Sequence, residues 1–134
     1  MSGCVLDTDV VIAALDRRDA HHEAATAALG TMIEAETPLM LSTVNYAEAL
    51  VRPAEDEQNL RAAVGAISAL GIKLIAPTPA MARDAARRRA LGISLADGFA
   101  VATAQAQRAS LATFDRRVRR TLAALGIALA SPLG

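Results

Sequence analysis

The sequence is poor in aromatic residues and in cysteine. Its 134 residues include one tyrosine, two phenylalanines and no tryptophan. Aromatic side chains are the usual platforms on which proteins stack the bases of single strands, so their scarcity argues against recognition of nucleic acid by stacking. The one cysteine, Cys4, has no partner for an internal disulfide. We expect it to be a small buried residue of a protein from a reducing compartment.

Long apolar runs are also missing. No stretch approaches the roughly 20 consecutive apolar residues of a membrane span. The N-terminal segment MSGCVLDTD lacks the basic and apolar regions of a signal peptide. We therefore expect a cytoplasmic protein that does not contact the membrane.

An excess of charge of either sign is absent as well. The formal net charge is zero, from 14 basic and 14 acidic residues, which excludes a generally basic surface but not a local basic patch. Every basic residue except Lys73 is an arginine, and most arginines form two groups: Arg83, Arg87, Arg88 and Arg89, then Arg116, Arg117, Arg119 and Arg120. Guanidinium groups suit phosphates, so any contact with nucleic acid is expected through the phosphates.

What is present is a regular alternation of short apolar runs and alanine-rich helical segments, in a length that fits one domain over residues 1–134. This alternation predicts an α/β fold with a mainly parallel sheet covered on both faces, a three-layer α/β/α sandwich. Thr78-Pro79 and Ser94 resemble helix starts, and Gly71 and Gly92 resemble helix ends. The predicted strands are Cys4–Leu6, Leu39–Leu41, Ile72–Ile75, Leu111–Thr113 and Ile127–Leu129.

Four acidic residues fall where such a fold binds ligands, outside the carboxyl ends of the strands. Asp7 follows the first predicted strand, and Asp115 follows the strand LATF. Asp97 lies in the first turn of the helix that begins near Ser94, and Glu48 lies early in the helix after the second strand. We therefore expect all four carboxylates at one rim of the sheet.

Helical spacing places two of these acids on apolar stripes. The stripes are Val44, Ala47, Glu48, Val51 and Asp97, Ala100, Val101, Ala104. We expect both stripes to face the core, where an ionised side chain is costly unless it is compensated.

Each acid also has a purely structural interpretation. Asp7 can cap a short helix over Val10–Leu15, Asp97 can complete a capping box with Ser94, and Asp115 can cap the arginine-rich helix that follows it. Glu48 can pair with Arg52 one turn later. Four independent caps, however, have no reason to converge at one rim.

A carboxylate cluster opposes its own assembly. Two unit charges 4 Å apart repel by about 4 kcal/mol at an effective dielectric constant of 20, so some groups take up protons or a cation lies among them. Oxygen ligands without histidine or cysteine suit Mg²⁺ or Mn²⁺ better than zinc. His21 and His22 open a helix elsewhere in the sequence and are expected at solvated positions.

The ordered set VLDTDVVIAAL, LMLSTVNYAEALVRP, ISLADGFAVATAQ and LATFDRRV resembles the PIN-domain family, specifically its VapC-type toxins. The resemblance implies a parallel sheet, an acidic Mg²⁺ or Mn²⁺ site at Asp7, Glu48, Asp97 and Asp115, and a homodimer silenced by a small antitoxin. It implies supporting roles for Thr8, Asp9 and Thr113, although serine or asparagine is commoner in the family at the position of Asp9. The activity it implies is metal-dependent hydrolysis of RNA phosphodiester bonds.

The arginines have two interpretations that the sequence leaves open. Arg87, Arg88, Arg89 and Arg116 are candidates for binding RNA phosphates or an acidic antitoxin segment. They can equally form a solvated helix face, and Arg87–Arg89 can interact with the dipole at a helix end.

Two other functions stay open. LDTDVV also fits the opening motif of haloacid-dehalogenase-like phosphatases, with Asp7 as nucleophile, Asp9 as general acid and Ser42 in a second motif. That function requires a lysine near the site, whereas the only lysine, Lys73, lies within an apolar strand, and it leaves Glu48 unexplained. A non-catalytic PIN-like binding module is the other alternative, although it has no need to keep four mutually repelling side chains.

Overall fold

Four short strands build one parallel sheet close to the predicted positions. The computed structural model describes residues 2–133. The strand order is β3-β2-β1-β4, and all three pairings are parallel. The strands are β1 (Cys4–Leu6), β2 (Leu39–Ser42), β3 (Lys73–Ile75) and β4 (Ser110–Ala112). The α/β class and the parallel sheet predicted from the sequence are confirmed.

The fifth predicted strand, Ile127–Leu129, is wrong. Leu129 forms only an isolated parallel bridge with Leu111, which is supported by hydrogen bonds from Leu111 N to Ala128 O and from Ala130 N to Leu111 O. Helix α7 (Arg116–Leu125) ends just before this stretch, and a 3-10 turn (Ser131–Leu133) follows it. Between them, the structure records one bridging residue, Leu129.

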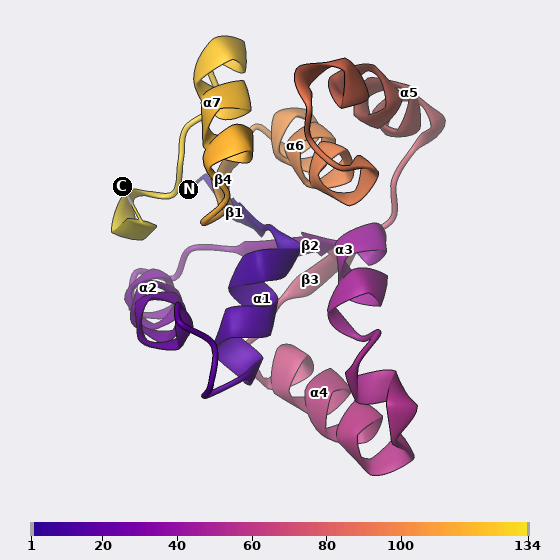
Figure 1. Cartoon of the computed structure of the whole chain (residues 1–134). Helices are drawn as coiled ribbons and strands as arrows, with labels where there is room; N and C mark the ends of the chain where they lie inside the picture. Colours follow the sequence, from indigo (N-terminus) through magenta and orange to yellow (C-terminus); the bar gives the residue numbers. More distant parts are fainter. Residues whose placement is uncertain (1, 134) are drawn as a thin grey trace.

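Helices cover both faces of the sheet (Figure 1). Successive side chains of a strand point to opposite faces, so Leu6 packs into one apolar cluster and Val5 into the other. The Leu6 side is covered by α1 (Thr8–Leu15), α2 (His22–Glu34), α3 (Thr43–Ala49) and α4 (Glu57–Ala69). The Val5 side is covered by α6 (Leu95–Gln107) and α7, and α5 (Pro79–Arg88) packs on α6. The predicted three-layer sandwich is confirmed.

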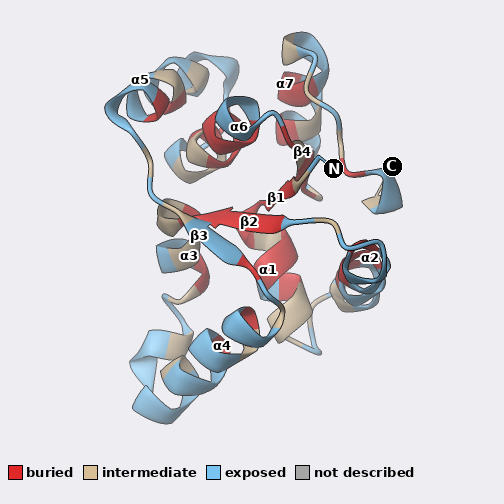
Figure 2. Ribbon diagram, turned by 180° about the vertical axis from the view of Figure 1, so that it is seen from behind, coloured by how far each residue is buried: buried red, intermediate tan, exposed pale blue. Residues whose placement is uncertain are grey.

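The centre of the sheet is buried, and its β3 edge is open (Figure 2). Cys4 and Leu41 are fully buried, whereas Lys73 and Leu74 of β3 are exposed. The interpretation of Cys4 as a small buried residue is therefore confirmed. Within residues 2–133, no helix combines the length and the apolar character needed to cross a bilayer.

The predicted helix ends are mostly correct. Thr78 caps α5 with its hydroxyl, which accepts a hydrogen bond from Met81 N at 3.2 Å, and Pro79 is the first helical residue. Ser94 caps α6, and its hydroxyl accepts from Asp97 N at 3.1 Å. Gly92, with φ +83°, ends a 3-10 turn in the left-handed region that glycine adopts without strain. These caps fix where α6 begins and therefore where Asp97 lies.

Candidate acidic site

Asp7 is the most deeply buried acid of the site. It follows β1 directly and has 1% of its surface exposed. One carboxylate oxygen, Oδ1, accepts from Thr8 N at 2.9 Å and caps α1. The other, Oδ2, accepts from Thr113 Oγ1 at 2.8 Å. The capping interpretation of Asp7 is thus correct but accounts for only one of its two oxygens.

Asp9 and Thr113 join the beginning of α1 to the end of β4. Asp9 Oδ2 accepts from Phe114 N at 2.9 Å, and Asp9 Oδ1 is buried without a hydrogen-bond partner. Thr113 Oγ1 lies 2.8 Å from Asp7 and 3.5 Å from Asp9, and it accepts from Asp115 N at 3.2 Å. A hydroxyl has a single proton to donate, so its main acceptor is Asp7.

Asp97 lies in the first turn of α6 and is half-buried. Burial raises its pKa, the hydrogen bond with Ser94 lowers it, and the nearby charges of Asp115 and Glu48 raise it again. Within the described chain its carboxylate accepts no bond from Ser94 N, so the capping box predicted with Ser94 has one of its two bonds. The stripe that Asp97 begins faces the core as expected, because Ala100, Val101 and Ala104 are fully buried.

The predicted stripe around Glu48 is wrong. Ala47 and Glu48 are exposed, and Val51 lies beyond the end of α3 with 64% of its surface exposed. The buried face of α3 is instead formed by Asn45 and Ala49, because this short helix packs against α1 and α6 at the rim of the sheet. Glu48 is still part of the acidic group, since its charge contributes to the raised pKa of Asp97.

Asp115 is exposed and caps α7, as its structural interpretation proposes. Its Oδ1 accepts from Arg117 N at 2.8 Å and from Val118 N at 3.0 Å. Its charge also raises the pKa of Asp9 and of Asp97. Asp115 therefore both caps a helix and lies within electrostatic reach of the other acids.

Like charge concentrates at this rim, and no ion pair among the described residues offsets it. The pKa of Asp7 is well above its usual range, because of burial first and then the charges of Asp9 and Asp97, while bonds from Thr113 and Thr8 oppose the rise. Burial also raises the pKa of Asp9. The ion pairs among residues 2–133 are Arg18–Asp16, Arg61–Glu57 and Arg87–Asp84, and none involves the site. The predicted pairing of Glu48 with Arg52 is absent from this set.

The donor set suits a hard divalent cation. Its side chains offer only oxygen, and the buried Asp9 Oδ1 lacks a partner. As they stand, however, no three histidine, cysteine, aspartate or glutamate side chains in the described chain are arranged to hold one ion. The acids therefore fit Mg²⁺ or Mn²⁺ in chemistry, and their side chains have to draw closer together to bind it.

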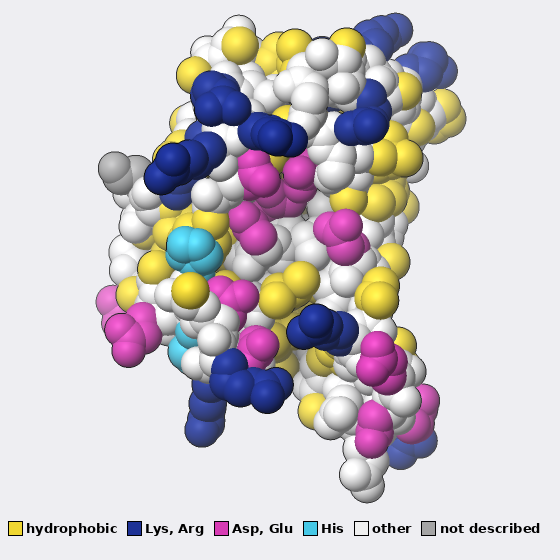
Figure 3. Space-filling view, in the orientation of Figure 1, with side chains coloured by type: hydrophobic (Ala, Val, Ile, Leu, Met, Phe, Trp, Pro, Cys, Tyr) yellow, Lys and Arg dark blue, Asp and Glu magenta, His cyan; other side chains and the backbone are white. Residues whose placement is uncertain are grey.

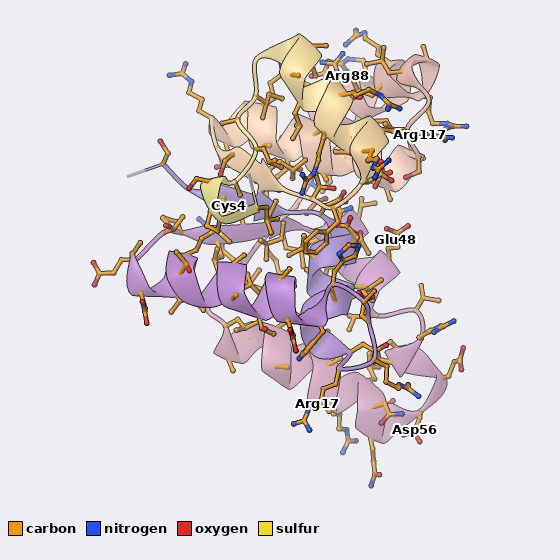
Figure 4. All side chains as sticks on the ribbon, turned by 60° about the vertical axis from the view of Figure 1, so that its left-hand side comes forward. Cys4, Arg17, Glu48, Asp56, Arg88 and Arg117 are labelled. Atoms are coloured by element: carbon orange, nitrogen blue, oxygen red, sulfur yellow. The ribbon has the colours of Figure 1, made fainter. Side chains whose placement is uncertain are left out.

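Arginines surround the acidic group on the side of α5 to α7 (Figure 3). Several have structural partners: Arg87 pairs with Asp84 at 2.6 Å, and Arg88 donates to Gln105 at 3.3 Å. Arg89 donates to Ile93 O at 2.7 Å. Arg116 is exposed. In Figure 4, Glu48 lies between Arg117 of α7 and Asp56, which caps α4.

Asn45 is a site residue that the sequence analysis missed. It is fully buried, and its amide nitrogen lies 3.0 Å from both Thr8 Oγ1 and Ala96 O. These bonds fasten α3 to the residue after Asp7 and to the residue before Asp97. The sequence signal for Asn45 is an amide side chain in a short helix. The predicted buried face of that helix was the one that carries Glu48, which is exposed, and Asn45 lies on the face that is buried.

The expectation of solvated positions is confirmed for His21 and wrong for His22. His22 is half-buried, with Nδ1 2.7 Å from Ala13 O. His21 is exposed, and its ring stacks on that of Phe114, the residue between Thr113 and Asp115. The contact with Phe114 thus joins His21 to the segment that carries Thr113 and Asp115.

The comparisons with known proteins agree with this architecture. The sequence pattern of the PIN domain matches residues 4–123, and the chain belongs to the PIN-domain family. A comparison with curated protein sequences found no match.

Solved structures of several toxin–antitoxin proteins share the fold. VapC20 from Mycobacterium tuberculosis, described as a toxin that cleaves the sarcin-ricin loop, is 15% identical with a TM-score of 0.71, covering 89% of this chain and 95% of that chain. VapBC2 from Rickettsia felis, bound to promoter DNA, is 14% identical with a TM-score of 0.73, covering 94% and 96%. FitAcB from Neisseria gonorrhoeae is 22% identical with a TM-score of 0.69, covering 96% and 97%. At these identities the likeness concerns the fold.

Proposed function

We propose that this chain is a metal-dependent endoribonuclease and the toxin of a toxin–antitoxin pair. The observation that carries the proposal is the group of acids at one rim, where the pKa values of Asp7, Asp9 and Asp97 are all raised and no ion pair neutralises them. Membership of the PIN-domain family supports the same activity.

Asp7, Glu48, Asp97 and Asp115 would hold Mg²⁺ or Mn²⁺. When bound, such an ion activates water and stabilises the charge that develops on a phosphate. Thr113 orients Asp7 through the 2.8 Å hydrogen bond, and Asn45 positions the segments that carry Asp7 and Asp97. The exposed carboxylates, Glu48 and Asp115, leave the site open toward the solvent and the arginines.

The proposed hydrolysis needs no protein nucleophile, because the bound ion would supply an activated water. We therefore expect products with 5′-phosphate and 3′-hydroxyl ends, and no requirement for the 2′-hydroxyl next to the scissile bond. Arg116 and Arg117 are exposed at the start of α7, where Arg117 Nη1 donates only a long bond to Gly92 O at 3.5 Å, so they are the better candidates for RNA phosphates. Arg87, Arg88 and Arg89 already have protein partners.

The proposed partners are an RNA substrate, a small antitoxin and a second copy of the chain. Structures with the same fold include a VapBC2 complex and FitAcB, which supports the antitoxin. The homodimer and the cytoplasmic location stay predictions from the sequence. The phosphatase alternative loses support, because Lys73 is exposed on the edge strand and the chain belongs to the PIN-domain family.

The deciding experiment incubates the purified protein with labelled tRNA and rRNA fragments in Mn²⁺ or in EDTA. Asp7→Ala and Asp97→Ala should abolish cleavage. Glu55→Gln should not change it, because Glu55 is an exposed acid of the 3-10 turn Pro53–Glu55 and not of the acidic group. Circular dichroism confirms that each variant is folded. Cutting that survives EDTA, or that persists in both aspartate variants, contradicts the proposal. A wild-type protein that neither cuts RNA nor is stabilised by Mn²⁺ would instead be the non-catalytic module.

A further inference from the structure

An aromatic pair stands beside the acidic group without a role in the chemistry described above. The rings of His21 and Phe114 are nearly parallel, at 9°, with their centroids 4.3 Å apart. Phe114 is half-buried and packs against the core on the α1 side of the sheet. His21 is exposed. One face of the imidazole is thus covered by Phe114, and solvent reaches the ring from elsewhere.

The pair is coupled directly to the acidic residues. Phe114 lies between Thr113 and Asp115 in the chain, and its backbone N–H donates to Asp9 Oδ2 at 2.9 Å. Figure 3 shows histidine side chains, in cyan, on the same face of the molecule as the largest group of acidic side chains. The imidazole is therefore joined, through Phe114, to the segment that carries Thr113 and Asp115.

The imidazole of His21 is held in place but is not needed by its helix. His21 is the cap residue of α2, where serine, threonine, asparagine or aspartate is preferred, and its side chain makes no capping bond. The turn before it is fixed by the bond from His21 N to Asp19 Oδ1 at 2.8 Å. The next residue, His22, is tied to Ala13 O of α1. The backbone thus positions the ring without using it.

We propose that His21, supported from behind by Phe114, is a stacking site for one unpaired nucleobase of the RNA substrate, a single exception to the phosphate contacts expected from a sequence with few aromatic residues. The proposal rests on the proposed ribonuclease function. Unpaired RNA bases stack on aromatic rings, histidine included, and this stacking tolerates any base because every base has a π-face. The nucleotide that stacks adjoins the scissile phosphate, so the subsite selects for single-stranded or looped RNA at the point of cleavage.

The first test measures binding without cleavage, in an Asp97→Asn background with Mg²⁺ present. Single-stranded RNA carries 2-aminopurine at one position at a time, and its fluorescence changes when the base stacks. We expect one responsive position. His21→Ala should remove the response and weaken affinity roughly 5- to 150-fold, the range that base stacking supports. His21→Phe should restore both, and Thr26→Ala, an exposed residue of α2 whose hydroxyl bonds only to its own helix, should change neither.

The second test uses cleavage by the otherwise wild-type chain. An abasic nucleotide at the responsive position should lower kcat/KM by a similar factor in the wild type and should have no further effect in His21→Ala. If wild-type RNA cleavage is intact but His21→Ala binds and cuts every substrate normally, the stacking site is refuted and the ribonuclease stands. A His21-dependent 2-aminopurine response without cleavage by the wild type supports the stacking site and contradicts the nuclease. Loss of affinity for a protein partner alone, with RNA binding unchanged, also refutes the stacking site.

Discussion

Replacing Asp7 by asparagine should stabilise the metal-free protein while it abolishes activity. The buried carboxylate of Asp7 has a pKa well above its usual range, because of burial and the charges of Asp9 and Asp97. Asparagine removes the charge and can preserve the hydrogen bonds. Its carbonyl oxygen can accept from Thr8 N, and its amide can donate to Thr113 Oγ1, whose own proton can turn to Asp9 Oδ2 at 3.5 Å.

The magnitude follows from the cost of keeping this carboxyl group buried, either ionised without a cation or protonated at a pH where the unfolded chain is ionised. Even after relaxation this penalty amounts to several kcal/mol per ion, and here hydrogen bonds offset part of it. We therefore expect Asp7→Asn to raise the free energy of unfolding by about 1–3 kcal/mol at neutral pH. For a chain of this length, that corresponds to a rise in Tm on the order of 5–10 °C.

The pH dependence distinguishes this cause from a general packing effect. Below the ordinary carboxyl pKa of about 3.9, Asp7 is protonated in both the folded and the unfolded chain, so variant and wild type should converge. As the pH rises through the raised pKa of the folded state, the wild type should lose stability relative to the variant. Chemical denaturation in EDTA from about pH 3 to pH 8 measures the difference, with Glu55→Gln as control. A variant that is less stable at neutral pH, or a gain independent of pH, refutes the reasoning.

Three further predictions concern the metal and the scaffold. Mn²⁺ at one hundred times its Kd should stabilise the folded wild type by about 2.7 kcal/mol and so raise its Tm, and it should have little effect on Asp97→Asn. Scanning calorimetry at increasing Mn²⁺ tests this. Gly98→Ala should lower the free energy of unfolding by about 1–3 kcal/mol, because the new Cβ would lie 2.8 Å from Ala85 O, where α6 packs on α5. Gly65→Ala has open space around it and should raise the free energy of unfolding by about 0.5–1 kcal/mol. Equal effects of the two variants in urea titrations would contradict the close contact between the helices. Asn45→Ala should lower the free energy of unfolding by about 1–3 kcal/mol, because Ala96 O and Thr8 Oγ1 lose their partner. It should also lower RNA cleavage in Mn²⁺ at temperatures where the variant is fully folded. Normal cleavage by the folded variant would contradict the positioning role of Asn45.

The sequence predicts the architecture because its signals are local. Apolar runs bounded by helix caps located the four strands within one or two residues, and Thr78 and Ser94 located the starts of α5 and α6. Ile127–Leu129 has the same composition as a strand but not the same surroundings. Whether an apolar run pairs over several residues depends on its tertiary contacts, and here Leu129 alone forms a bridge, with Leu111.

The candidate site was predicted less completely, because burial depends on contacts between distant segments. The connection rules of a parallel sheet placed the four acids at one rim. Helical periodicity then assigned Glu48 to a buried face, although α3 packs at the edge of the sheet and buries Asn45 and Ala49 instead. The meeting of His21 with Phe114 joins residues 93 positions apart, and no spacing in the sequence predicts it.

The exposure of the acids is graded, and this gradient allows the proposed metal site to be stable without an ion. Asp7 is buried, Asp97 is half-buried, and Glu48 and Asp115 are exposed. In the absence of a cation, the buried group can hold a proton and the exposed groups can keep their charge in water, so the folded chain avoids the full repulsion of four ionised carboxylates. Binding a divalent ion should therefore release a proton, chiefly from Asp7, and metal affinity should increase as the pH rises through the raised pKa of this residue. If the order of burial were reversed, Glu48 and Asp115 would be buried and Asp7 exposed. The buried Asp115 would then tend to hold the proton, and the helix cap of α7 would lose its negative charge.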